Sequence, residues 1–93
     1  MKELTMFYLD DCGYCLKARR ALDELLAENP AYAAVELTRI EESREPELAE
    51  RYDYYAVPSF FIGQEKLFEA HIGMSYEDIK AAVKQCLDAA LTA

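Results

Sequence analysis

An apolar run that leads directly into two closely spaced cysteines constrains the fold of this chain more than any other feature. Residues 3–9 are largely apolar at both alternating positions, which is typical of a central strand covered on both faces. Cys12 and Cys15 follow, and residues 13–28 repeat their apolar side chains with the spacing of a helix. Cβ atoms three positions apart in a helix lie about 5–6 Å from each other, close to the reach of a disulfide. This segment therefore predicts a strand, a turn and a helix, with a redox-capable cysteine pair at the turn.

The next segment predicts a second strand and a short acidic helix. Asn29-Pro30 ends the first helix, and residues 33–38 have the apolar character of a strand. A strand, a helix and a strand in succession favour a βαβ unit with parallel strands and a right-handed crossover. Residues 43–52 then form an acidic helix with Pro46 in its first turn. The inward face of that helix is expected to consist of Leu48, Ala49 and Tyr52.

The last third of the chain predicts a hairpin and a long helix. Residues 59–62 form a strand, 63–66 a tight turn, and 67–70 a strand that pairs back. Ser75 and Asp78 have the spacing of a capping box, which begins a helix. The buried stripe of this helix is expected to be Ile79, Ala82, Val83, Cys86, Leu87 and Ala90. The order of elements is therefore β-α-β-α-β-β-α.

The length and composition favour one folded domain, residues 1–93. Apolar residues are plentiful, so disorder is not expected. No apolar run approaches the roughly 20 residues of a membrane span, and the first residues lack the apolar core of a signal peptide. We therefore expect a cytoplasmic protein with no membrane association, in which a Cys-x-x-Cys pair cycles between its two redox states.

The charge excludes one class of partner. Eighteen acidic and ten basic residues give a net charge of −8. Nucleic-acid binding is disfavoured, because phosphates require a basic surface. The acidity favours solubility and can steer basic partners, but does not identify one.

Three motifs, in order along the chain, resemble the glutaredoxin branch of the thioredoxin superfamily. They are Cys12-Gly13-Tyr14-Cys15 after the first strand, Ala56-Val57-Pro58 before the third, and Ile72-Gly73 before the last helix. The resemblance spans essentially the whole chain. It implies an α/β, thioredoxin/glutaredoxin-like fold, with a four-stranded mixed sheet and helices on both faces. It also implies an enzyme, a small thiol–disulfide oxidoreductase that reduces protein disulfides or mixed disulfides.

The two cysteines of the motif are expected to have different roles. Cys12 is the expected nucleophile, because free N–H groups and the dipole at a helix start favour a thiolate. Asp10 and Asp11 act against a second negative charge, but exposed charges are screened, so we expect the helix to prevail. Cys15 lies one turn into the helix on its apolar stripe, where burial keeps it protonated, as suits a resolving thiol.

The resemblance also implies the residues that bind substrate. Pro58 is expected to be cis and to pack against the cysteine pair, with the backbone of Val57 pairing with an extended substrate. Tyr14 is expected to be exposed beside the nucleophile, where its ring can contact a substrate or have no role. Gly73 is the fourth candidate, from the motif before the last helix.

Several other residues have ordinary structural explanations. His71 is expected on the surface, and Cys86 as a buried, inert thiol. Of Tyr52, Tyr54 and Tyr55, we expect Tyr52 and one neighbour in the core and the other near the substrate groove. A zinc site needs about four ligands, and beyond the cysteine pair only His71 and Cys86 are candidates, so no metal site is expected.

The motifs depart from the family pattern in ways that affect glutathione. Dithiol glutaredoxins usually have proline where Gly13 stands, and a lysine shortly before the first cysteine where this chain has Asp10 and Asp11. The glycine pair and downstream aspartate with which glutaredoxins bind the γ-glutamyl group of glutathione are matched only in part, by Gly73, Ser75 and Asp78. The buried aspartate of thioredoxins is absent, because Met6 occupies that region.

Two alternatives therefore stay open beside the oxidoreductase. One is a glutaredoxin-type iron–sulfur cluster carrier that uses Cys12 and glutathione in a dimer; the other is a docking module without catalysis. For the oxidoreductase we expect a monomer without a tightly bound cofactor and with disulfide-containing protein substrates. Either glutathione or a thioredoxin-reductase-type enzyme would reduce it.

Overall fold

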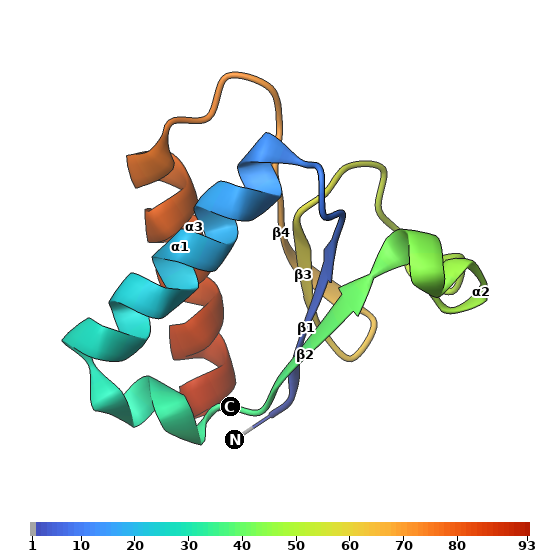
Figure 1. Cartoon of the computed structure of the whole chain (residues 1–93). Helices are drawn as coiled ribbons and strands as arrows, with labels where there is room; N and C mark the ends of the chain where they lie inside the picture. Colours follow the sequence, from blue (N-terminus) through green and yellow to red (C-terminus); the bar gives the residue numbers. More distant parts are fainter. Residues whose placement is uncertain (1) are drawn as a thin grey trace.

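A four-stranded mixed sheet forms the centre of the molecule (Figure 1). A computed structural model describes residues 2–93. The strand order is β2-β1-β3-β4, with β1 spanning Leu4–Tyr8, β2 Leu37–Glu41, β3 Ser59–Ile62 and β4 Glu65–Glu69. β1 and β2 are parallel, whereas β3 is antiparallel to both β1 and β4. The expected mixed sheet is thus confirmed.

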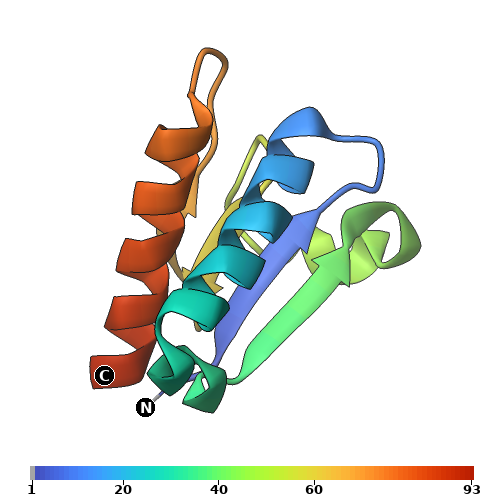
Figure 2. The ribbon, with the colours of Figure 1, turned by 60° about the vertical axis from the view of Figure 1, so that its left-hand side comes forward.

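Helices cover both faces of this sheet, as expected. α1 (Gly13–Glu28) and α3 (Tyr76–Thr92) lie side by side on one face (Figures 1 and 2). The short α2 (Pro46–Ala49) lies on the other. Two 3₁₀ helices, η1 (Pro30–Ala34) and η2 (Glu42–Arg44), flank β2. Within residues 2–93, the helices are too short or too polar to cross a membrane.

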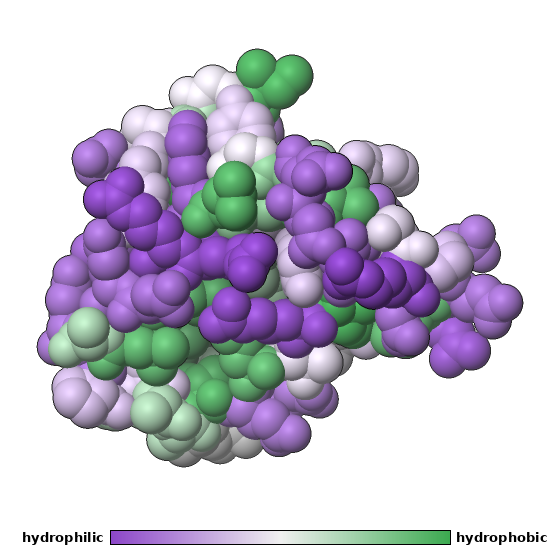
Figure 3. Space-filling view, in the orientation of Figure 1, coloured by the Kyte–Doolittle hydropathy of each residue, from purple (hydrophilic) through white to green (hydrophobic). Residues whose placement is uncertain are grey.

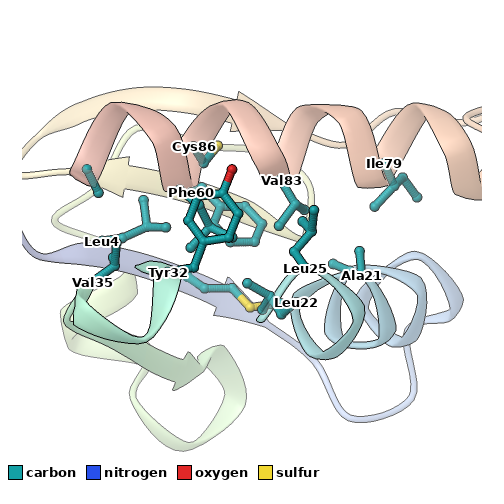
Figure 4. Close-up of a cluster of buried hydrophobic side chains, with 14 residues drawn as sticks. Leu4, Ala21, Leu22, Leu25, Tyr32, Val35, Phe60, Ile79, Val83 and Cys86 are labelled. Carbon is teal, nitrogen blue, oxygen red and sulfur yellow. The ribbon is translucent and has the colours of Figure 1, made fainter. Parts of the chain in front are cut away.

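The larger core lies between the sheet and the two long helices. Figure 4 shows side chains of α1 and α3 pointing toward each other above the sheet. Phe60 of β3 is fully buried among them. The stripe expected on α1 is confirmed, because Cys15, Ala18, Leu22 and Leu25 are all buried. On α3 the buried residues are Ile79, Val83, Cys86, Leu87 and Ala90, with Ala82 only partly buried.

A smaller, aromatic core lies on the α2 face. Phe7, Ile40 and Phe61 are its buried members. The ring centroids of Tyr52 and Tyr54 lie 4.7 and 4.9 Å from that of Phe7. Such ring pairs add to the stability that buried area alone provides. The partly buried residues that complete this core are Leu48, Ala49, Tyr52, Tyr54 and Val57.

The second strand was predicted at 33–38, and this boundary was wrong. Residues 30–34 form η1 instead, because Asn29 Oδ1 accepts a hydrogen bond from the Ala31 N–H and Pro30 stands in the first turn. Tyr32 is then buried in the larger core. The strand starts later, at Leu37, which pairs with Leu4 of β1.

The short acidic helix and the hairpin also differ at their ends. The helix predicted at 43–52 is divided into η2 and α2, because Pro46 lacks the N–H that would continue a helix from the preceding turn. β4 begins at Glu65 rather than at residue 67, since Gly63 adopts a φ of 58° and makes the turn tighter. The capping box of Ser75 and Asp78 is present as predicted and begins α3.

Candidate functional site

Cys12 lies at the N-cap of α1, as predicted. Its Sγ accepts a hydrogen bond from the Cys15 N–H at 3.2 Å, and the side chain is partly exposed. An N-cap acceptor satisfies one of the free N–H groups of the first turn, and a negative charge there is stabilised by the helix dipole. Cys12 is therefore placed at the start of the helix where a substrate can reach its sulfur from solvent.

Cys15 lies one turn into α1 and is fully buried in the larger core. Burial, followed by the hydrogen bond to Cys12, raises the pKa of its thiol from 9.0 to about 12. Both cysteines are free thiols in this structure. At neutral pH Cys15 thus keeps its proton, in keeping with the expected division of roles.

The loop before β3 meets the nucleophile. The Val57–Pro58 peptide bond is cis, which confirms what the family resemblance implied. The Cys12 thiol donates a hydrogen bond to the Val57 carbonyl oxygen at an S···O distance of 3.6 Å. Pro58 is fully buried, and Val57 is partly buried against the aromatic core. Two segments 45 residues apart are therefore joined at the sulfur that is expected to react.

Glu69 holds this loop in place, and the sequence analysis did not identify it. Its carboxylate accepts hydrogen bonds from the N–H groups of Tyr55 (2.5 Å) and Ala56 (2.6 Å), and pairs with Lys66 (2.7 Å). Burial opposes ionisation, but the hydrogen bonds from Lys66 and the two amides outweigh it and lower the pKa of Glu69. Glu69 thereby fixes the two residues that precede Val57.

Glu41 has a similar position on the other side of Cys12, and it was also not identified. It is a buried carboxylate at the end of β2. One oxygen accepts hydrogen bonds from the N–H and hydroxyl of Ser43, both at 2.6 Å, and the other accepts a weak one from the Asp10 N–H at 3.5 Å. The bonds from Ser43 come first among the causes that lower the pKa of Glu41. The residues just before Cys12 are thus connected to β2.

Tyr14 and Gly73 contact each other rather than presenting two free groups. Tyr14 was expected to be exposed, but it is partly buried against the larger core, and this expectation was wrong. Its hydroxyl oxygen accepts a hydrogen bond from the Gly73 N–H at 2.8 Å. Gly73 has a φ of 97°, a conformation that favours glycine. The redox motif is therefore attached to the loop that precedes α3.

The histidine, the third cysteine and the three clustered tyrosines lie where they were expected. His71 is exposed, and Cys86 is buried in the larger core, where burial raises the pKa of its thiol to about 12. Tyr52 and Tyr54 belong to the aromatic core, whereas Tyr55 is exposed beside the Val57–Pro58 loop. In the part of the chain that the structure describes, no three His, Cys, Asp or Glu side chains gather as metal ligands would.

One comparison with known proteins identifies a family, and another supports the fold. The model of the glutaredoxin family matches residues 4–67. No curated protein matches the sequence. The structure is similar to that of a malarial protein (TM-score 0.59, 17% identity, covering 90% of this chain and 94% of that one). It is also similar to a mutant thioredoxin from Halobacterium salinarum (TM-score 0.56, 21% identity, 90% and 73% covered).

A further similar structure is oxidised glutaredoxin 2 from Chlamydomonas reinhardtii. It has a TM-score of 0.53 and 21% identity, with 98% of this chain and 80% of that chain covered. At such identities a structural likeness establishes the fold alone. The family assignment comes from the sequence match, which includes both cysteines and the Val57–Pro58 loop.

Proposed function

The chain belongs to the glutaredoxin family, and we propose that it reduces protein disulfides or mixed disulfides by a cycle of the Cys12 and Cys15 thiols. The family and the fold support a role as a thiol oxidoreductase in general. One observation supports the specific cycle of Cys12 and Cys15. The partly exposed Cys12 sulfur accepts the Cys15 N–H and touches the Val57 carbonyl, while the buried Cys15 thiol lies one helical turn away.

The reaction takes place in two exchanges. The Cys12 thiolate attacks one sulfur of the substrate disulfide, and the other substrate sulfur leaves as a thiolate and takes up a proton. Cys15 then loses its proton and attacks the Cys12 sulfur of the mixed disulfide, which releases the second substrate thiol. Two electrons pass to the substrate, and the enzyme is left with a Cys12–Cys15 disulfide.

The raised pKa of Cys15 fits this order of events. A thiol with a pKa of about 12 is protonated at neutral pH and does not compete with Cys12 for the substrate. Once Cys12 is in a mixed disulfide, its sulfur is an electrophile that lies within one helical turn of the Cys15 thiol. The proton of Cys15 must then pass to solvent or to the departing thiolate.

The backbone of Val57 supports a role in positioning substrate. Its carbonyl faces Cys12, and among residues 2–93 its N–H has no hydrogen-bond partner. An extended substrate strand that uses both groups would place its own sulfur next to Cys12. In this proposal Pro58 supports the strand from below, and Tyr14 and Gly73 shape the neighbouring loop.

We propose the remaining properties on the basis of the sequence. The protein would act in the cytoplasm as a monomer, without a tightly bound cofactor, membrane or nucleic acid. Glutathione or a thioredoxin-reductase-type enzyme would return the cysteine pair to the dithiol. Turnover with each donor in turn, at matched concentrations of one disulfide substrate, identifies which one is used.

The test is the redox equilibrium of the cysteine pair in a series of glutathione buffers, measured by mass after alkylation. We expect a reversible two-electron step, with a midpoint below about −230 mV for a thioredoxin-like reductant, or near −200 mV and above for a glutaredoxin or an oxidant. Cys12→Ser should abolish turnover, and Cys15→Ser should accumulate a mixed disulfide. Cys86→Ser is the matched control and should leave the step unchanged.

The same measurement addresses the alternatives. If no reversible two-electron step occurs, the oxidoreductase proposal fails. The iron–sulfur alternative would then need a coloured protein after anaerobic reconstitution with glutathione, since each chain offers Cys12 as its one cysteine that is not buried. A colourless protein without a redox step would leave the docking module.

A further inference from the structure

We propose that the surface around Cys12 selects a polypeptide disulfide flanked by basic and apolar side chains, in preference to glutathione. This inference rests on the proposed function and names its substrate class.

Three exposed apolar side chains belong to the segments that form the candidate site. Leu16, Tyr55 and Ile72 are the large hydrophobic residues that residues 2–93 leave exposed, at 55%, 89% and 91%. Single exposed apolar residues are ordinary, but their gathering at one end of a molecule is informative. We call these three residues the apolar rim.

Each member of the rim belongs to a different segment of the site. The Leu16 N–H donates to the Cys12 carbonyl in the first turn of α1. Tyr55 is held by Glu69 two residues before Val57, and Ile72 precedes Gly73, which Tyr14 binds.

The figures show how these segments lie. The start of α1, the loop before β3 and the loop before α3 lie at the same end of the molecule (Figures 1 and 2). In Figure 3 an apolar protrusion stands at the top, where Figure 1 shows the loop before α3. Much of the rest of that face is hydrophilic. The segments that carry the apolar rim therefore lie at the end of the molecule where α1 begins with Cys12 at its N-cap.

A hollow beside Cys12 has an excess of negative charge. Cys12 itself lines it, together with the carboxylates of Asp10, Asp11 and Glu41 and the guanidinium of Arg44. Arg44 is already paired with Asp10 at 2.5 Å. Asp11 is exposed and forms no ion pair within residues 2–93. The hollow thus favours a cation next to the nucleophile.

The rim and the hollow together fit one kind of substrate. Glutathione has two carboxylates and one ammonium group, so the charges of the hollow repel it. A polypeptide with a lysine or arginine near its cysteine places a cation in the hollow, and its apolar side chains can cover the rim. Electrostatic attraction of this kind raises association rates and weakens as salt is added.

The experiment compares four oxidised substrates under steady-state turnover, with a fixed concentration of dithiothreitol as the common reductant of the Cys12–Cys15 disulfide and the rate without protein subtracted. Two are peptides of equal length with one internal disulfide, flanked by lysine and leucine in one and by glutamate and leucine in the other. The third is oxidised glutathione, and the fourth is hydroxyethyl disulfide, which is small and uncharged. We expect kcat/KM for the basic peptide to exceed that for the acidic peptide about tenfold at low salt. The ratio should approach one at 0.5 M NaCl.

Variants locate the source of the preference. Asp11→Asn should lower the ratio of kcat/KM for the basic peptide to kcat/KM for the acidic peptide. A general change in the reactivity of Cys12 would change both values equally and leave this ratio unchanged. Asp23→Asn removes an exposed carboxylate elsewhere on α1 and should leave the ratio unchanged. Ile72→Ser should raise KM for the leucine-containing basic peptide, but not for the same peptide with serine in place of leucine.

The outcomes separate this inference from the proposed function. Equal kcat/KM for the two peptides, or faster turnover of oxidised glutathione, overturns the inference, while turnover of hydroxyethyl disulfide keeps the proposed function. The inference is also overturned if Asp11→Asn and Asp23→Asn lower the ratio of the two kcat/KM values equally. The preference would then come from the net charge of the protein rather than from the hollow beside Cys12. Failure with all four substrates refutes the proposed function, and the inference with it.

Discussion

One face of the sheet is covered by helices of 16 and 17 residues, and the other by a helix of four. Each face supports one half of the candidate site. Cys15 is buried in the large core between α1, α3 and the sheet, and Cys12 begins the same helix. Val57 instead packs on the small aromatic core of the α2 face.

This difference indicates how the two halves respond to change. Regions with few buried apolar contacts open at lower free-energy cost than a large core does. The cysteine pair therefore depends on the packing that stabilises the whole fold. The substrate loop depends on a few aromatic rings and on polar contacts such as those of Glu69. Substitutions on the α2 face are expected to change substrate binding before they change global stability.

The largest expected effect compares two neighbouring phenylalanines. Phe60 and Phe61 are both fully buried, but Phe60 belongs to the large core and Phe61 to the small one. Phe60→Ala should lower the free energy of unfolding by about 3–5 kcal/mol, and Phe61→Ala by less, because partly buried rings around it can move into the space. Urea unfolding measures both.

If the alanine variant of Phe60 does not fold, the comparison uses Phe60→Leu and Phe61→Leu. Equal losses at the two positions, or a larger loss at Phe61, would show that the two faces are equally rigid.

A smaller effect is expected from one hydroxyl group of the aromatic core. The Tyr54 hydroxyl donates to the Glu42 carboxylate at 2.6 Å. Burial, followed by that hydrogen bond, raises the pKa of Tyr54, so the phenol stays protonated at neutral pH. Tyr54→Phe should cost about 1 kcal/mol of unfolding free energy, since the pair is partly exposed.

Tyr52→Phe is the matched control for this hydrogen bond. Tyr52 packs on the same Phe7 ring, and its hydroxyl has no hydrogen-bond partner within residues 2–93. The control should lie within about 0.5 kcal/mol of the parent protein. A loss as large as that of Tyr54→Phe would assign the effect to ring packing rather than to the bond with Glu42.

Glu69 offers a test of the substrate loop alone. Glu69→Ala removes the acceptor of the Tyr55 and Ala56 N–H groups, which can turn to water because both residues are exposed. We expect KM for a peptide disulfide to rise about threefold with kcat little changed, as loss of positioning predicts. Steady-state kinetics measure the separation.

Glu65→Ala, at the other end of β4, removes an exposed carboxylate without a side-chain contact to the loop. It should leave KM unchanged. If Glu69→Ala lowers kcat and leaves KM unchanged, Glu69 does not act through the position of Val57.

The smallest effect is a pH dependence on the α1 and α3 side. A hydrogen bond from Tyr76, followed by one from Lys80, lowers the pKa of Glu24 from 4.5 to about 2. The folded state thus favours the ionised carboxylate, so this contribution is complete above pH 4.5 and is lost as the pH falls toward 2.

The melting temperature of the parent protein should therefore decrease as the pH falls from 4.5 toward 2. The decrease should be smaller in Glu24→Gln. Because these groups are partly exposed, the effect should be small and weaker in high salt. Asp23→Asn, on the same helix, should leave the slope unchanged. A slope that is identical in all three proteins would show that the contacts of Glu24 do not stabilise the fold.

Local sequence patterns predicted most of the fold and the chemical centre of the site. The helix of residues 13–28 has its predicted bounds, because apolar spacing and the Asn29-Pro30 stop act within a few residues of each other. The capping box at Ser75 is equally local. β2 was misplaced for two reasons: Asn29 and Pro30 begin η1 by local contacts, and Tyr32 is buried against α3, a distant partner that a local pattern does not show.

The sequence by itself determined the cysteine pair at a helix start, the proline before the third strand and the order of strands and helices around them. These depend on spacing, on backbone restrictions and on hydrophobic periodicity, which neighbouring residues already contain. Only the tertiary structure decided that Glu69 and Glu41 hold the loops beside Cys12, and that the Tyr14 hydroxyl accepts a hydrogen bond from the Gly73 N–H. The physical reason is distance along the chain: Cys12 and Val57 are 45 residues apart, and Tyr14 and Gly73 are 59 apart. Such pairs form only when strands and helices have packed, and what they contact then follows from the assembled shape rather than from any local preference.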